Sequence, residues 1–161
     1  MREHVINAIQ FIFLIVAIVV AFSFYKAHNR VVVKTGDDGM LPEYAQGSYG
    51  LRSDYDKAAD LAVGVAVAYH PPGKPEEEWV GWVVAREGQK VQTKPRGTDT
   101  RRMYLWVDGQ ESALQSGLTP RQPMPEIVIP RNCVFVIRKD SGKDSFTFGP
   151  IPLRLVKGRM K

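Results

Sequence analysis

This chain of 161 residues has few cysteines, few histidines and a small net charge, and each of these features excludes a class of protein. Cys133 is the only cysteine, so an intramolecular disulfide scaffold is excluded. One cysteine and three scattered histidines, His4, His28 and His70, do not make a zinc site. The 22 Lys+Arg exceed the 17 Asp+Glu by only five charges, spread along the chain, so we expect no nucleic-acid partner. The sequence has no phosphate loop or dinucleotide fingerprint, so we also expect no cofactor.

One long hydrophobic run stands near the N-terminus. Residues 5–25 read VINAIQFIFLIVAIVVAFSFY and carry no charge. A bilayer core of about 30 Å needs about 20 apolar residues in a helix. We therefore expect a transmembrane helix over residues 5–25 that contacts membrane lipid, after a short flank (1–4) and before a juxtamembrane linker or first strand (26–35). The alternative is a cleaved signal peptide, but the apolar run is longer than a typical signal core.

Beyond residue 30 the chain shows no sustained helical period, which predicts a mainly β fold with the β domain at residues 36–161. The expected strands are short apolar runs, often β-branched, bounded by Gly, Pro, Asn or Asp. They lie at 30–33, 61–69, 80–85, 103–107, 127–129, 134–137 and 150–156. The polar stretches 71–78, 92–102 and 117–125 are expected to be solvated loops. At 44% hydrophobic residues, the chain can bury one core and is expected to form one domain after the hydrophobic run.

Six short blocks follow the hydrophobic run. They read GDDGMLP (36–42), GSYGLRS (47–53), VGVAVAYHPP (63–72), GWVVAREGQKV (81–91), YLWVDGQ (104–110) and KDSGKDSFTFGPIPLRLVKGR (139–159). In this order the chain resembles the type I signal peptidases, a family of S26-type serine peptidases. The family's blocks run S-M-x-P, G-D-x-V-x-V, K-R-V-V-x-x-P-G-D, a V-N-G strand and turn, and G-D-N-x-x-x-S-x-D-S-R-x-F-G. The resemblance implies a membrane anchor followed by a signal-peptidase-like β domain on the outer face of the membrane.

The resemblance also implies a chemistry, the hydrolysis of a peptide bond by a Ser–Lys pair. A serine hydroxyl needs a neighbouring base, and a lysine serves when burial lowers its pKa. Hydrogen-bond donors hold the oxyanion as it develops. The substrate lies as an extended strand beside the protein's own strands.

The residues for this chemistry are missing from the matching positions. The serine of S-M-x-P falls on Gly39, and the lysine of K-R-V-V falls on Gly81. Asp37 stands where the family often has a serine donor, and its carboxylate would repel an oxyanion. Removing one half of such a pair usually costs several powers of ten in rate. The sequence therefore predicts a member of the family that lacks the Ser–Lys dyad and has no catalytic residues of this kind.

The remaining motif residues, both those that are lost and those that are kept, indicate a structural role and not a catalytic one. The aspartates of the second and third blocks fall on Val65 and Gln89, and the serine and arginine of the last block fall on Gly142 and Phe146. The residues that survive shape turns or fill a core: Met40, Pro42, Val83, Val84, Gly88, Gly109, Asp144, Ser145, Phe148 and Gly149.

A relocated catalytic pair is the main alternative. The candidate hydroxyls and amines are Ser48, Ser53, Ser141, Ser145, Lys34, Lys90 and Lys143. A cysteine nucleophile at Cys133 would need a histidine base, for which His70 is the candidate. We expect each of these to be a surface, turn or core residue instead.

An apolar row around the degenerate site is the candidate binding groove. Its members are Met40, Leu41, Pro42, Trp79, Trp82, Val83 and Val84. The functional hypothesis is a groove that holds a polypeptide segment without cutting it; the alternative is that the tryptophans simply pack on the strand faces.

These inferences predict a catalytically inactive binding or assembly factor, or an accessory subunit of a larger membrane complex. Its partner would be a protein or an exported polypeptide, and its location the bacterial inner membrane with the domain on the extracytoplasmic side. The alternatives are an active membrane peptidase with a non-standard pair and a cytoplasmic-facing scaffold. The flank charges favour the last of these, because Lys26, Arg30 and Lys34 follow the hydrophobic run.

Overall fold

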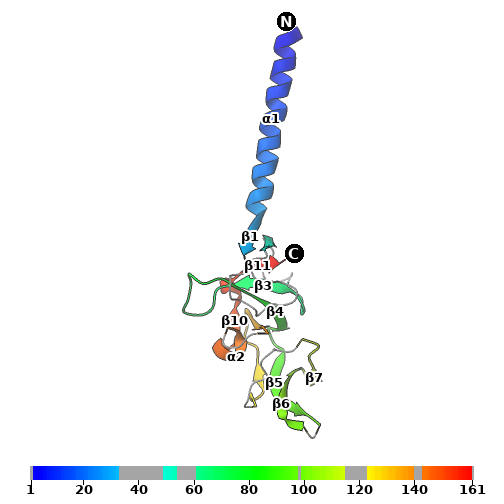
Figure 1. The fold of residues 1–161 in the computed structure, drawn as a ribbon, viewed down its shortest axis with the longest axis vertical. Helices are drawn as coiled ribbons and strands as arrows, with labels where there is room; N and C mark the ends of the chain where they lie inside the picture. Colours follow the sequence, from blue (N-terminus) through cyan, green and yellow to red (C-terminus); the bar gives the residue numbers. More distant parts are fainter. Residues whose placement is uncertain are drawn as a thin grey trace.

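The computed structural model describes residues 2–32, 49–53, 61–97, 99–114, 123–139 and 143–160. It consists of one long N-terminal helix and a β domain built from two antiparallel sheets (Figure 1). The strands are β1 His28–Val32, β2 Tyr49–Ser53, β3 Ala66–Tyr69, β4 Trp79–Arg86, β5 Lys90–Arg96, β6 Asp99–Val107, β7 Gln110–Glu111, β8 Ile127–Val128, β9 Cys133–Ile137, β10 Ile151–Pro152 and β11 Val156–Met160. A short helix α2 (Ser145–Phe148) and a 3-10 turn (Leu153–Leu155) complete the domain.

Helix α1 (Arg2–Ala27) extends away from the domain and leads directly into β1 (Figure 1). Its large apolar side chains between Ile9 and Phe24 are exposed, from 45% at Ile15 to 73% at Phe13. Among the described residues, no helix is long and apolar enough to cross a membrane.

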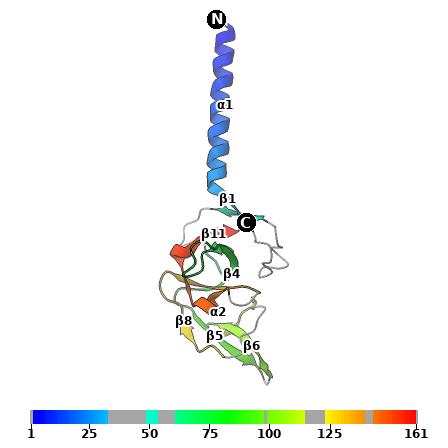
Figure 2. The same cartoon turned by 60° about the vertical axis from the view of Figure 1, so that its left-hand side comes forward.

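The larger sheet has seven strands in the order β1-β2-β11-β3-β4-β9-β10. The last strand, β11, lies between β2 and β3, so the C-terminal end of the chain returns to the base of α1 (Figures 1 and 2). Strand β4 is central, pairing with β3 on one side and with β9 on the other. This placement buries both faces of β4, and only its last residue, Arg86, is exposed.

Two apolar clusters fill the core on the two faces of this sheet. One contains Trp79, Val83 and Val136, and the other contains Val80, Trp82 and Val84. Successive side chains of a strand point to opposite faces, so neighbouring residues of β4, such as Trp79 and Val80 or Val83 and Val84, belong to different clusters. The continuous apolar run of β4 follows from this burial on both sides.

The smaller sheet has four strands in the order β7-β6-β5-β8. Strands β5 and β6 form a hairpin at the end of the domain far from α1 (Figures 1 and 2). Residues 92–96 and 99–102 are therefore strand, and their sequence-based prediction as a solvated loop is wrong. Residues 92–95 pair with residues 103–106, and Arg96 pairs with Asp99. Val91, Thr93 and Leu105 supply the buried face that the hairpin needs.

The turn between β6 and β7 is Asp108-Gly109, with φ of 49° and 79°. Positive φ at both central residues defines the type I′ turn, for which Asp-Gly is a preferred pair. The Asp108 carboxylate accepts hydrogen bonds from Lys90 N and from Gln89 Nε2, both at 2.8 Å. These bonds, that from the Lys90 backbone first, lower the pKa of the Asp108 carboxyl below its ordinary value of 3.8. The turn is thereby tied to the start of β5.

The lowered pKa of Asp108 predicts a pH-dependent effect of Asp108→Asn on stability. A carboxyl whose pKa is lower in the folded state stabilises the fold above its unfolded pKa, and this contribution is lost as the pH falls through the folded pKa. Urea unfolding of the full chain in mild detergent should show the largest difference between Asp108→Asn and the parent near pH 7. The difference should shrink as the pH falls below the ordinary value of 3.8 and through the lower pKa of the folded state. A difference of the same size at every pH would contradict the prediction.

Candidate functional site

Gly81, at which the resemblance to the signal peptidase blocks predicts the base lysine, lies in the middle of β4. It pairs with Val67 of β3 and is buried. Alternation along the strand puts Gly81 on the same face as Trp79 and Val83, which pack in one cluster. A side chain at this position would therefore point into the core between β4 and β9.

The space that such a side chain would need is already filled. A Cβ atom at Gly81 would lie 2.5 Å from Val136 Cγ1, 3.0 Å from the backbone oxygen of Ile137 and 3.3 Å from Arg138 Cγ. The first distance is well below van der Waals contact, and Val136 is fully buried. The absence of a side chain at Gly81 therefore lets β9 lie close against β4.

Arg138 is the charged residue closest to this contact. Its side chain is fully buried, and its Nη1 donates a hydrogen bond of 2.7 Å to the carbonyl oxygen of Val80. An arginine keeps its charge in proteins and has no acceptor atom, so it cannot act as a general base. The group next to position 81 is thus a permanent cation, where the family's chemistry needs a neutral amine.

The turn after β9 is built by the surviving aspartate and serine of the last block. Asp144 caps α2 by accepting a hydrogen bond from Phe146 N at 3.0 Å, and its other oxygen accepts one from Arg138 N at 3.4 Å. The Ser145 hydroxyl accepts a bond of 2.9 Å from Val136 N. Both side chains are 2% exposed. Asp144 and Ser145 therefore hold β9 in place beside β4.

The aromatic residues of the same block pack into the core. Phe146, where the family motif has arginine, meets Phe135 edge to face, with ring centroids 5.4 Å apart. Phe148 packs 5.9 Å from Trp79. Gly149 ends α2 with a φ of 77°. Gly88 and Gly109 also have positive φ, at 80° and 79°, in the turns that flank β5 and β6.

The apolar row expected from the sequence does not form one surface in the part that the structure describes. Trp79 and Val83 belong to one core cluster, and Trp82 and Val84 belong to the other, on the opposite face of β4. All four side chains are at most 8% exposed. This placement fits the alternative in which the tryptophans pack on the strand faces. The remaining predicted members, Met40, Leu41 and Pro42, lie outside the described residues, as do Gly39 and Asp37.

The alternative catalytic groups that are described have other contacts. Ser145 Oγ is buried against Val136 N, whereas Lys90 Nζ forms an exposed ion pair with Glu126 at 3.0 Å. Lys143 Nζ lies 5.7 Å from the Trp79 ring centroid. Among the described residues, these contacts put no lysine amine beside Ser145. Ser48, Ser141 and Lys34 lie outside the described residues, and the Ser53 side chain is likewise not described.

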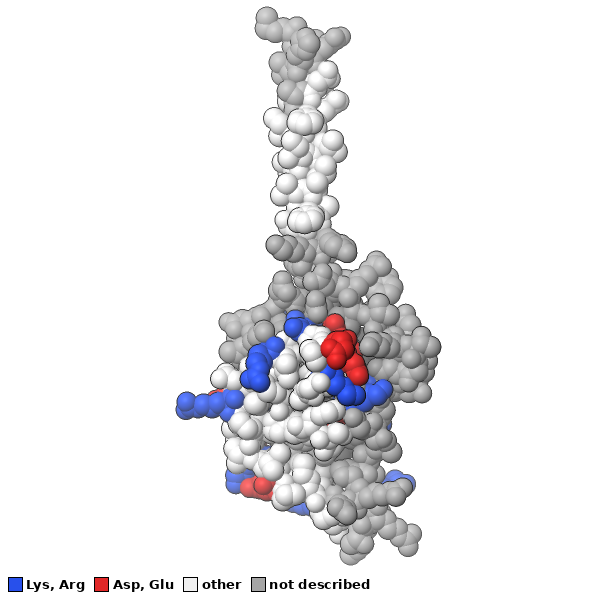
Figure 3. Space-filling view, turned by 90° about the vertical axis from the view of Figure 1, so that its left-hand side faces the viewer, with Lys and Arg blue, Asp and Glu red and all other residues white. Residues whose placement is uncertain are grey.

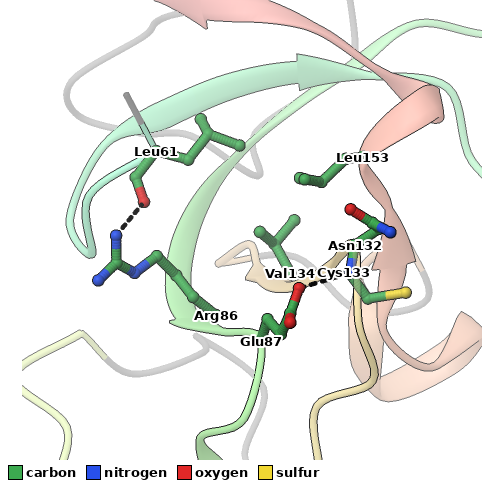
Figure 4. Close-up of a pocket in the computed structure, with 7 residues that line it drawn as sticks. All are labelled: Leu61, Arg86, Glu87, Asn132, Cys133, Val134 and Leu153. Atoms are coloured by element: carbon green, nitrogen blue, oxygen red, sulfur yellow. Dashed lines mark hydrogen bonds between the residues drawn. The ribbon is translucent and has the colours of Figure 1, made fainter. Parts of the chain in front are cut away.

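Cys133 lines a cavity of about 90 Å³ between the end of β4 and the start of β9 (Figure 4). Glu87, which also lines it, accepts a hydrogen bond of 2.8 Å from Asn132 N. Burial raises the pKa of the Cys133 thiol, which disfavours the thiolate that a nucleophile needs. His70 Nδ1 instead shares a hydrogen bond with Glu77 O. Among the described residues, no group of His, Cys, Asp and Glu is arranged to hold a metal ion.

The comparison with known families assigns the class of protein. The family model described as signal peptidase, peptidase S26, matches residues 5–161. The chain therefore belongs to the signal peptidase S26 family, and the β-rich fold is consistent with that membership. No curated protein matches the chain.

Sequence analysis missed Arg138 as part of this site. The only signal was a charged residue directly after the apolar run Val134–Ile137, where the pattern alone predicts a strand end facing solvent. The stem of Arg138 packs beside Gly81, which lies on the neighbouring strand β4 and far away in the sequence.

The close contact at Gly81 predicts that Gly81→Ala destabilises the fold. Overpacking a buried site of this kind costs about 1–3 kcal/mol of unfolding free energy. Urea unfolding of the full chain in mild detergent measures the loss, with exposed Thr147→Ala as a control that should change stability by less than about 0.5 kcal/mol.

Val136→Ala identifies the atom responsible for the loss. It removes Val136 Cγ1, so Gly81→Ala should cost less in this background, by at least about 0.5 kcal/mol. If Gly81→Ala leaves the unfolding free energy unchanged, or if the costs of the two substitutions are additive, then the space beside Gly81 is open and the prediction is wrong.

Proposed function

We propose that this family member does not cleave peptide bonds by the Ser–Lys mechanism and acts as a binding or assembly factor, or as an accessory subunit of a membrane complex. The observation that carries the proposal is the filled space at Gly81. A residue at the aligned base position has no side chain, and Val136 and Arg138 occupy the volume into which one would extend.

The surroundings of Gly81 support the same proposal. The contacts of Asp144 and Ser145 hold the strand β9 and the helix α2, and Phe146 contributes an aromatic ring to the core. Residues that assist catalysis in an active relative would here serve stability. A fold that keeps its framework without the reacting groups fits a protein that binds polypeptides.

The proposal predicts that the purified full chain leaves a preprotein uncleaved. The assay incubates a secretory preprotein with the protein in detergent micelles and follows the leader by gel and mass spectrometry. A signal peptidase with an intact Ser–Lys pair provides the positive control. The double substitution Gly39→Ser and Gly81→Lys should also stay inactive, because a lysine side chain at position 81 would collide with Val136 and the Ile137 backbone. Removal of the leader by the unaltered chain would refute the proposal.

We also propose that residues 5–25 anchor the protein in the bacterial inner membrane, with the domain on the extracytoplasmic side. The proposal depends on the uncharged sequence of this segment and on the exposure of its apolar side chains. In Figure 3 the described side chains of α1 include no Lys, Arg, Asp or Glu, whereas the domain below carries both signs of charge. Exposed apolar surface of this length is stabilised by lipid. The extracytoplasmic position of the domain is inferred from the family.

The anchor predicts that the chain stays with membranes during alkaline carbonate extraction. Two arginines near the middle of the helix, Leu14→Arg with Ile18→Arg, should release it, because each costs about 2.5–3.5 kcal/mol at a helix centre. The matched control is Val63→Arg with Val128→Arg, which changes two apolar residues of the domain that are 51% and 56% exposed. This control should remain in the pellet. Extraction of the unaltered chain, or retention of the helix variant, would contradict the anchor.

A further inference from the structure

The β5–β6 hairpin has an outer face that the core does not use. Val91, Thr93 and Leu105 point toward the core and are at most 3% exposed. Alternation places Lys94, Tyr104 and Trp106 on the opposite face, where all three side chains are partly exposed. We call this face, with Arg96 and Arg102, the arm face; its remaining members are Gln92 and Glu111.

Cations lie over aromatic rings along the arm face. Lys94 Nζ lies 3.9 Å from the centroid of the Trp106 ring, and Arg96 Cζ lies 5.9 Å from that of Tyr104. Arg96 also pairs with Glu111 at 3.3 Å. Arg102 is exposed and lies two residues before Tyr104 in β6, where the register against β5 shifts. Of the described side chains named here, three are cations and one is an anion, so the face attracts acidic groups.

The edge of β6 beside this face is largely uncovered in the described part of the chain. Strand β7 pairs only with Trp106 and Val107, and Ser112 N donates to Leu105 O. No described strand pairs with the outer edge of β6 from Asp99 to Tyr104. Backbone groups along such an edge can pair with an added strand.

The geometry points to the arm face as a docking site for an extended acidic polypeptide segment that adds to the edge of β6. Backbone hydrogen bonds to β6 give affinity, and acidic side chains on one side of the added strand meet Lys94, Arg96 and Arg102. The rings of Tyr104 and Trp106 provide apolar contact beneath the cations.

A peptide fits this surface better than the other common polyanions. Tight nucleic-acid binding uses about 6–10 phosphate contacts, more than three cations and one anion provide. Lipid headgroups are disfavoured because the hairpin lies at the end of the domain opposite α1 (Figures 1 and 2). Neither a nucleic acid nor a lipid headgroup would add a strand to the backbone edge of β6.

The inference gives a partner chemistry to the binding role proposed above and rests on that role for the existence of a polypeptide partner. The arm face belongs to the four-stranded sheet, whereas Gly81 lies in the seven-stranded sheet. Binding at the arm and cleavage of a preprotein are therefore measured independently, and the failure of one does not imply the failure of the other.

The test measures fluorescence anisotropy of a dye-labelled peptide with five Glu-Val repeats against the full chain in neutral detergent. We expect saturable binding that weakens with salt, and no binding of the matching Lys-Val peptide. Arg102→Glu should weaken binding at least tenfold, and Arg102→Lys should keep it within about threefold. The matched control is Arg131→Glu, which makes the same charge change at a side chain that is 91% exposed outside the arm, and should leave binding unchanged.

Two further probes test the mode of binding. Glu-Val peptides methylated on all Glu nitrogens or on all Val nitrogens each block one edge of the added strand, and one of the two should bind at least tenfold more weakly. Equal binding of the two methylated peptides would overturn strand addition.

A ten-residue oligothymidylate and anionic lipid vesicles test the choice of a polypeptide. If either binds as tightly as the Glu-Val peptide, and its binding is equally sensitive to Arg102→Glu, that choice is wrong. If the peptide does not bind, or if Arg131→Glu weakens binding as much as Arg102→Glu does, the arm face is not the docking site.

Discussion

The contact between β4 and β9 at Gly81 is the constraint on which the centre of the domain depends. With no side chain at this position, Val136 and the stem of Arg138 lie directly over the backbone of β4. A buried guanidinium costs several kcal/mol unless hydrogen bonds compensate it. The carbonyl of Val80 supplies one such bond, and the Asp144 carboxylate holds the backbone of Arg138 itself. The cap of α2, the end of β9 and the bare position in β4 therefore form one unit, in which each part stabilises the next.

The two sheets of the domain differ in what they contribute to the core and to the surface. The seven-stranded sheet contains the first and last strands, β1 and β11, and the unit around Gly81. The four-stranded sheet contributes Val91 and Leu105 to the shared core but turns its polar face outward. The first sheet is buried on both faces of β4 and offers little surface for a partner there. A binding role is thus easier to place on the outward face of β5 and β6 than on the apolar row around β4.

Sequence patterns predicted the β-rich class and most of the core strands, because those strands are apolar runs between turn residues. Strand β4 and strand β9 lie within two residues of the expected ranges. The hairpin β5–β6 was not predicted over its polar half, since Lys94, Pro95 and Arg96 resemble a loop when their partners across the hairpin are not considered. The separation of Trp79 from Trp82 follows from strand alternation and could have been predicted. The burial of Arg138 could not, because it requires the register of β4 against β9 and the volume left by a distant glycine.

The contact at Gly81 also bears on how this chain relates to a family whose chemistry needs a lysine. A lysine at position 81 would begin 3.3 Å from the Arg138 stem, and its amine would share a buried region with a guanidinium that never loses its proton. Two cations enclosed together disfavour each other, and the steric conflict with Val136 adds to the cost. The glycine at position 81 and the buried arginine at position 138 are therefore compatible with each other, whereas a lysine at position 81 is not compatible with Arg138. A lysine at position 81 would therefore need different side chains at positions 136 and 138. The bare position at Gly81 is thus matched to the two side chains that pack over it, Val136 and Arg138.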